Sequence, residues 1–156
     1  NRRHFDKYLS KSWSRATQTK SLVSIIIMDV DNFKAYNDNY GHQAGDHCLR
    51  EIAGAISDST KSEEVLVARF GGEEFITVIP GVDLSQANAL AEIMREKVLE
   101  LAIPHKFSGI NNIVTMSVGV ASEQATDLHC SKVLIEKADQ NLYQAKALGR
   151  NRTVAE

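Results

Sequence analysis

The sequence has few of the residues that cross-link a chain, interrupt it or anchor it in a membrane. It contains two cysteines and two prolines among 156 residues. Cys48 and Cys130 lie far apart and form no Cys-x-x-Cys pair, so the sequence indicates neither a zinc site nor a disulfide framework. We expect both to be small buried side chains. No apolar run approaches the roughly 18–20 residues of a membrane span, and no signal peptide is visible.

Composition and charge are those of one ordinary globular domain. Hydrophobic residues make up 43% of the chain and charged residues 24%, and a chain of this length can bury a core. Residues 1–20 hold six lysines and arginines and one acid, whereas the rest is acidic, and the net charge is −2. A basic stretch can attract nucleic acid or a membrane surface, but no aromatic-rich basic motif accompanies this one. We expect a solvated helix face and no nucleic-acid partner.

Apolar periodicity divides the chain into interleaved helices and strands. Helical spacing predicts a short helical turn between residues 32 and 42, a helix after the capping box of Asp83 and Gln86, and helices over 3–16, 43–56 and 131–148. Apolar, β-rich runs predict strands over 22–28, 65–68, 75–79 and 113–121. This order predicts an α/β (α+β) fold, with a mixed central sheet and helices on its faces.

The first predicted strand leads directly into a carboxylate. Its apolar run is nearly continuous, as expected of a strand that is buried on both faces in the middle of a sheet. Asp29 follows at the end of that strand. Because a buried charge is costly unless it is paired or bound to a metal ion, we assign Asp29 a functional role.

A second pair of carboxylates follows a predicted hairpin. Gly71 and Gly72 join two apolar runs, and both glycines can adopt the positive φ of a tight turn. Glu73 and Glu74 come next, and consecutive strand residues point to opposite faces, so these carboxylates should have different tasks. If the hairpin pairs with the first strand, Asp29 and Glu73 converge at one edge of the sheet, where one or two divalent cations would bind.

The polar residues around these carboxylates suit a nucleotide. Mg²⁺ prefers oxygen ligands and keeps substrate phosphates in its shell, so Asp29, Glu73 and a main-chain carbonyl would suffice. Asp46 has two explanations, because the dipole of a helix alone stabilises a carboxylate in its first turn. The candidates for triphosphate oxygens are Lys34, Lys146 and Arg150, and those for a base edge are Asn37 and Asp46. The pattern predicts nucleotidyl transfer.

Together these segments resemble the GGDEF family of diguanylate cyclases, and the resemblance covers almost the whole chain. The family's motifs occur in its order, which a chance match would not produce. The matching segments are Asn1–Arg3, Asp29–Lys34, Asn37–Asp38, Tyr40–Asp46, Ala68–Phe75, Ser117–Val120, Ala138–Asp139, Leu142–Lys146 and Gly149–Asn151. Because Asn1-Arg2-Arg3 reads as the interior of a segment, we expect one catalytic domain over residues 1–156 of a longer protein with an upstream sensor or regulatory domain.

The resemblance implies a fold, a reaction and partners. The fold would be similar to the palm of nucleotide cyclases and polymerases. Two such domains, a homodimer, would face each other, each with one GTP. The 3′-hydroxyl of each GTP would attack the α-phosphate of the other, which yields cyclic di-GMP and two pyrophosphates. The domain would be cytoplasmic, and membrane anchoring of the parent protein stays open.

The resemblance also implies residue roles. Mg²⁺ or Mn²⁺ would bind Asp29, the Val30 carbonyl and Glu73. Glu74 would bind a second ion or assist deprotonation of the hydroxyl, two roles that stay open. His42 would contact the nucleotide or cap a helix, and the other histidines would be surface or ordinary polar positions. The remaining contacts would be guanine at Asn37 and Asp46, phosphates at Lys34, Lys146, Arg150 and the amides near Asn32 and Phe33, and the nucleotide against Gly71 and Gly72.

Two positions sharpen the expectation. Asp46 keeps the residue type associated with guanine, which favours GTP. Many relatives carry an Arg-x-x-Asp product-inhibition motif just before the hairpin, whereas this chain has Ser62-Glu63-Glu64-Val65. We therefore expect no product inhibition at that site. The alternatives are a catalytically inactive module that binds GTP or cyclic di-GMP, and a plain dimerisation scaffold, which would leave Asp29, Glu73 and Lys146 without a purpose.

Overall fold

The computed structural model describes all 156 residues, and its elements follow the predicted order with one addition. Most helices and strands are longer than predicted by one to three residues at an end. The addition, β5, has only three residues, too few to show a periodic pattern. The elements are α1 Arg2–Thr19, β1 Leu22–Val30, α2 Phe33–Tyr40, α3 His42–Asp58, β2 Leu66–Gly71, β3 Glu74–Pro80, α4 Leu84–Glu100, β4 Met116–Gln124, α5 Lys132–Ala147 and β5 Thr153–Ala155.

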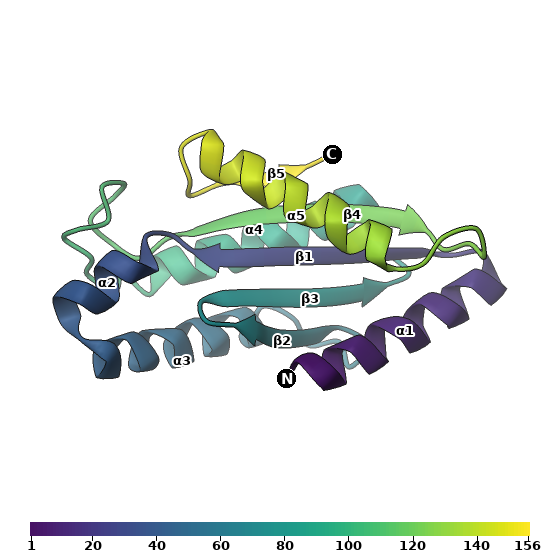
Figure 1. Ribbon diagram of the computed structural model, residues 1–156, viewed down its shortest axis with the longest axis horizontal. Helices are drawn as coiled ribbons and strands as arrows, with labels where there is room; N and C mark the ends of the chain where they lie inside the picture. The colour runs from purple at the N-terminus through teal and green to yellow at the C-terminus, as the bar shows by residue number, and fades with distance from the viewer.

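The five strands form one mixed sheet with β1 at its centre, as predicted. Their order is β2-β3-β1-β4-β5 (Figure 1). β1 is antiparallel to both β3 and β4, and β4 is parallel to β5. β4 begins at Met116, later than the predicted residue 113, because Ile113 pairs only through an isolated bridge with Pro104. The hairpin of β2 and β3 therefore lies directly beside the central strand.

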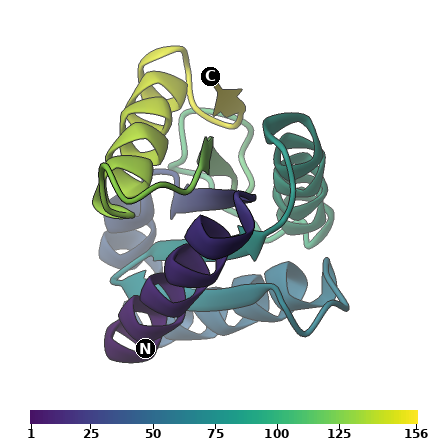
Figure 2. The ribbon, with the colours of Figure 1, turned by 90° about the vertical axis from the view of Figure 1, so that its right-hand side faces the viewer.

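Helices cover both faces of this sheet. α1 and α5 lie on one face, and α3 and α4 lie on the other (Figure 2). Alternate residues of β1 enter the two cores: Ile25 and Ile27 pack with α1 and α5, whereas Ile26 and Met28 pack with α2, α3 and α4. A strand with two buried faces has no solvent-facing positions, which explains its continuous apolar sequence.

The topology brings several chain segments to one end of the sheet. The end of β1, the β2–β3 turn and the start of α2 all lie there, at the left of Figure 1. The register pairs Asp29 of β1 with Glu74 of β3, and the Val30 amide donates to the Glu73 carbonyl at 3.2 Å. The predicted convergence of the strand-end carboxylate with the hairpin is confirmed.

Some surface expectations hold and others fail. The basic side chains of α1 are exposed while Phe5, Leu9 and Trp13 are buried, so the basic stretch is a solvated helix face. Cys48 is buried as expected, but Cys130 is exposed, because it lies in the loop between β4 and α5. No helix is both long and apolar enough to cross a membrane.

We predict that Gly119→Ala destabilises the fold by about 1–3 kcal/mol, because the added methyl group overpacks a close helix–sheet contact. A Cβ at Gly119 would lie 2.1 Å from the Ala138 carbonyl oxygen and 2.3 Å from the Leu142 nitrogen, so α5 would have to move. Urea unfolding measures the effect. Gly54→Ala is the matched control, because Gly54 lies in α3 with open space around it. This change should raise the free energy of unfolding by about 0.5–1 kcal/mol. Equal effects of the two substitutions would contradict the prediction.

Candidate active site

A cavity of about 170 Å³ lies where β1, α2, the hairpin turn and the end of α5 meet. Its walls carry both signs of charge. The lining residues are Asp29, Val30, Asp31, Asn32, Phe33, Lys34, Glu73, Lys146 and Arg150. The structure thus brings together most of the residues that the sequence singled out for metal and phosphate binding.

Asp29 pairs with Lys146 inside this cavity. The Lys146 ammonium lies 2.8 Å from the Asp29 carboxylate, and the side chains are 35% and 15% exposed. Burial raises the pKa of Asp29 above its ordinary value, the hydrogen bond and charge of Lys146 oppose this, and the carboxylates of Glu73 and Asp31 raise the pKa further. Lys146 thus only partly offsets the effect of burial and of the neighbouring carboxylates on the pKa of Asp29.

Glu73 and Glu74 occupy different surroundings, but Glu73 lies in the turn before β3, so the predicted alternation along a strand does not apply to it. Glu73 lines the cavity, whereas Glu74 does not and pairs in register with Asp29. Burial raises the pKa of Glu74, and Asp29 and then Asp139 raise it further. Gly71 and Gly72 form the turn with φ of 143° and 50°, and both are exposed. The Arg69 guanidinium donates to the Gly72 carbonyl at 2.8 Å and fixes the turn.

Asp31 is a buried carboxylate that sequence reasoning did not single out. Only 2% of it is exposed. It accepts hydrogen bonds from the Thr115 hydroxyl at 2.7 Å, the Ser117 hydroxyl at 2.6 Å and the Asn151 amide at 3.1 Å. Asp31 therefore joins the end of β1 to β4 and to the turn after α5. The signal was present as the second carboxylate of Asp-Val-Asp, but its partners lie more than 80 residues away.

The start of α2 forms another wall of the cavity. Asn32 stands before the helix with a left-handed φ of 51°, and no side chain caps the helix. The first amides of a helix lack intrahelical partners, so this end suits an anion. Two residues between α4 and β4 contact Asn32: its side chain donates to the Ser108 carbonyl, and His105 Nε2 lies 3.2 Å from its main-chain oxygen. His105 is fully buried, so of the two positions expected for it, surface or ordinary polar, the surface position is wrong.

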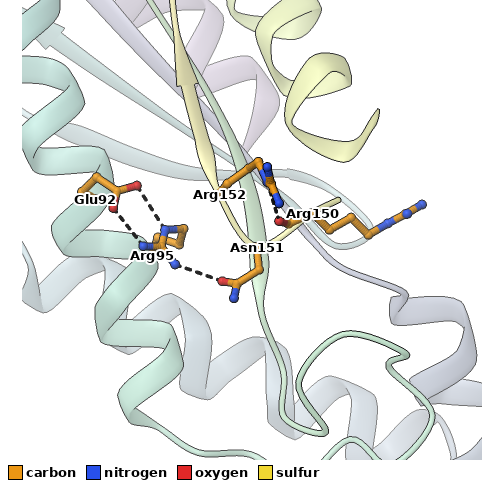
Figure 3. A network of polar contacts seen from close by, with 5 residues as sticks. All are labelled: Glu92, Arg95, Arg150, Asn151 and Arg152. Atoms are coloured by element: carbon orange, nitrogen blue, oxygen red, sulfur yellow. Dashed lines mark hydrogen bonds and ion pairs between the residues drawn. The ribbon is translucent and has the colours of Figure 1, made fainter. Parts of the chain in front are cut away.

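Arg150 reaches the cavity from a turn after α5. Gly149, Arg150 and Asn151 all have positive φ, at 124°, 65° and 47°. Figure 3 shows the side chain of Arg150 pointing away from Arg95, while Arg95 binds both Glu92 and Asn151. Lys34 lies at the cavity rim, 92% exposed, and pairs with Asp38 at 3.1 Å. Two cations thus stay free of the carboxylates at the centre of the cavity.

The predicted base-reading residues lie on α2 and α3, outside the cavity lining. The Asn37 amide oxygen is buried without a hydrogen-bond partner, packed against Gly45, where a Cβ would lie 1.8 Å from it. His42 and Asp46 are exposed. α3 begins at His42 and has no acid in its first turn, so the helix-dipole explanation for Asp46 is wrong.

The donor set of the cavity fits a hard cation. Asp29, Glu73 and the Val30 main chain offer oxygen ligands, and a bound cation would offset the burial and, to a smaller extent, the carboxylate repulsion that raise the pKa of Asp29. Nowhere in the chain do three His, Cys, Asp or Glu side chains gather as a metal cage. Mg²⁺ does not need one, because it usually binds one or two carboxylates plus substrate phosphates.

Comparison with known proteins assigns the family. A family model described as diguanylate cyclase, GGDEF domain, matches residues 1–152. The chain belongs to the GGDEF-domain family of diguanylate cyclases. It is 43% identical over 135 residues to diguanylate cyclase A of Treponema denticola, covering 86% of this chain and 35% of that protein. It is 37% identical over 156 residues to the response regulator PleD of Caulobacter vibrioides, covering 99% of this chain and 34% of that protein.

Solved GGDEF domains share the fold. The active GGEEF domain of a diguanylate cyclase from Vibrio cholerae superimposes with a TM-score of 0.85 at 33% identity, over 99% of this chain and 95% of that one. The GGDEF domain of DgcB from Caulobacter crescentus, in complex with c-di-GMP, gives 0.88 at 30% identity, over 99% and 89%. The chain spans about a third of the length of the two curated relatives above, and nearly all of these solved GGDEF domains.

We predict that Glu74→Gln raises stability near pH 7 when metal is removed with a chelator. Folding raises the pKa of Glu74 above 4.5, so the folded state binds its proton more tightly than the unfolded chain does. The charged carboxylate therefore costs stability as the pH rises through 4.5 toward the raised pKa. Urea midpoints should be higher for the variant at about pH 7 and equal to wild type at about pH 4. Glu136→Gln, at an exposed position on α5, is the control. A gain that is the same at both pH values would refute this account.

Proposed function

We propose that this domain condenses two GTP into cyclic di-GMP and two pyrophosphates. The observation that carries the proposal is the cavity itself, which places the carboxylates of Asp29 and Glu73 beside Lys146, Arg150 and the uncapped start of α2. Carboxylates that bind a cation, with cations and amides that bind phosphate, are what phosphoryl transfer requires. Membership of the diguanylate cyclase family supports the same reaction.

In this proposal Mg²⁺ or Mn²⁺ is held by Asp29, Glu73 and the Val30 carbonyl. The bound ion supplies charge neutralisation at the reacting phosphate. Lys146 and Arg150 bind triphosphate oxygens, with Lys34 at the rim and the Asn32 and Phe33 amides at the start of α2. Gly71 and Gly72 carry no side chain, so the nucleotide lies against the hairpin turn. Glu74 binds a second ion or takes up the proton of the attacking hydroxyl.

Guanine recognition is assigned to Asn37 and Asp46. The side-chain oxygen of Asn37 has no hydrogen-bond partner within the chain, and an unpaired buried polar atom calls for an explanation. An amide and a carboxylate together offer the donors and acceptors that a guanine edge needs. The exposed position of Asp46, beyond the first turn of α3, leaves its carboxylate available to a ligand. His42, also exposed, lies four residues before Asp46 on α3 and therefore on the same face of that helix, from which it could assist.

The proposal requires two copies of the domain. Cyclic di-GMP is two-fold symmetric, and each of its phosphodiester bonds joins the 3′-oxygen of one guanosine to the α-phosphate of the other. Two identical sites that face each other across a two-fold axis present both α-phosphates equivalently. We therefore propose a homodimer as the catalytic unit, with one GTP in each domain.

The wild-type domain at high concentration should convert GTP to cyclic di-GMP when Mg²⁺ is present, as detected by mass spectrometry. Glu73→Ala should lower the rate at least about a hundredfold, because it removes a metal-binding carboxylate. It should leave urea stability nearly unchanged, since a hairpin-turn carboxylate adds little to the core. No product from concentrated wild type would instead favour a module that only binds GTP or cyclic di-GMP. A fully active Glu73→Ala variant would overturn the metal assignment.

Added cyclic di-GMP should inhibit the domain only in competition with GTP. The segment Ser62–Glu64 is exposed and carries two acids, which repel a dianionic product. Initial rates at several GTP concentrations separate competitive from non-competitive inhibition. Non-competitive inhibition by cyclic di-GMP would show that product binds outside the active site and would contradict this prediction.

A further inference from the structure

The turn that carries Arg150 is strained. Arg150 and Asn151 are two successive residues with side chains, and both adopt left-handed φ, at 65° and 47°. A residue other than glycine in this region costs about 1–3 kcal/mol, and it persists only where the surroundings fix it. The position of Arg150 therefore depends on whatever holds this turn.

The main chain of the turn is fixed on several sides. The Arg150 amide donates to the Ala145 carbonyl at 3.0 Å, and the Arg150 carbonyl accepts from the Arg152 guanidinium at 3.0 Å. The main-chain amide of Asn151 donates to Asp31 at 3.1 Å. These bonds attach the turn to α5 and to the end of β1. None of them fixes the side chain of Asn151.

Arg95 fixes that side chain from α4. The Arg95 Nη1 donates to the side-chain oxygen of Asn151 at 3.0 Å. Its Nε and Nη2 donate to the two carboxylate oxygens of Glu92 at 3.1 and 2.8 Å (Figure 3). Only 14% of the Arg95 side chain is exposed. The hydrogen bond from Arg95 lowers the pKa of Glu92, so the carboxylate and the guanidinium form a charged pair. The guanidinium is thus held in one orientation before it reaches Asn151.

We propose that Arg95 is a positioning residue for GTP binding, which acts through Asn151 to set where Arg150 presents its guanidinium to a phosphate. Arg95 does not line the cavity. Asn151 connects it both to the turn of Arg150 and to Asp31, so one asparagine couples α4 to two walls of the cavity. This inference rests on the proposed role of Arg150 in phosphate binding.

The contacts of Arg95 with Glu92 and Asn151 explain why position 95 needs arginine. A planar guanidinium binds Glu92 with two parallel bonds and still has a donor directed at Asn151. The ammonium of lysine is a single point and cannot make all three contacts in that geometry. Asn151 in turn suits a left-handed position better than other residues with side chains.

Direct binding of 3′-deoxy-GTP with Mg²⁺ tests the proposal, because this analogue lacks the attacking hydroxyl and cannot react. Arg95→Lys should weaken binding about tenfold, since it removes the bond to Asn151. Asn151→Gly keeps the main-chain amide and relieves the strain while deleting the side chain, and should weaken binding to a similar extent. Asn151→Asp keeps the acceptor and should bind like wild type. Lys97→Gln, exposed on the same helix, is the control.

A double-mutant cycle separates positioning from general stability. In an Arg150→Ala background, Arg95→Lys should cause no further loss of binding, because its effect passes through Arg150. An equal loss in both backgrounds, or no loss in the wild-type background, overturns the proposal. An Arg150→Ala domain that binds as tightly as wild type overturns it at its premise. Synthesis of cyclic di-GMP by the wild type is a separate measurement, so failure of the proposed function is recognised independently.

Discussion

The site depends on one buried carboxylate. Asp31 accepts three hydrogen bonds, two from hydroxyl groups and one from a main-chain amide, and it is nearly inaccessible to water. A buried charge persists when such donors replace its hydration. Its partners come from β4 and from the turn after α5, and its own main chain joins β1 to α2. This one side chain therefore adds hydrogen bonds to both β4 and the turn after α5, beside the β1–β4 pairing and the Lys146–Asp29 ion pair.

Around Asp31 the cavity is built from strained backbone that is held from outside. Asn32 has left-handed φ and is braced by His105 and Ser108, whereas Arg150 and Asn151 are braced by Asp31 and Arg95. Strain of this kind collects at functional sites because a few positions must aim their groups at a ligand. Asp31 lines the cavity, but the other bracing residues, His105, Ser108 and Arg95, lie outside its lining, in a loop and in α4. Binding geometry is therefore distributed over more of the fold than the lining residues suggest.

Local signals made much of this predictable. The apolar run of β1, the Gly71-Gly72 turn and the capping box of Asp83 and Gln86 each identify an element from a few neighbouring residues, and all three are observed. Contacts between distant residues were not predictable. The role of Asp31 depends on Thr115 and Asn151, and the burial of His105 depends on packing beside Tyr36. The exposure of Cys130 likewise depends on a loop that has no periodic pattern.

The placement of charge in the cavity also limits how it can bind a nucleotide. Lys146 already contacts Asp29 at 2.8 Å, so a phosphate that binds Lys146 must share it with a carboxylate. An ammonium has three donors, and the structure uses one of them, which leaves two for phosphate oxygens. Lys146 can therefore bridge Asp29 and a phosphate, whereas Arg150, without a carboxylate partner, is free to bind phosphate alone. Lys146 is held by the carboxylate of Asp29 and Arg150 by its turn, so the two side chains depend on different parts of the fold.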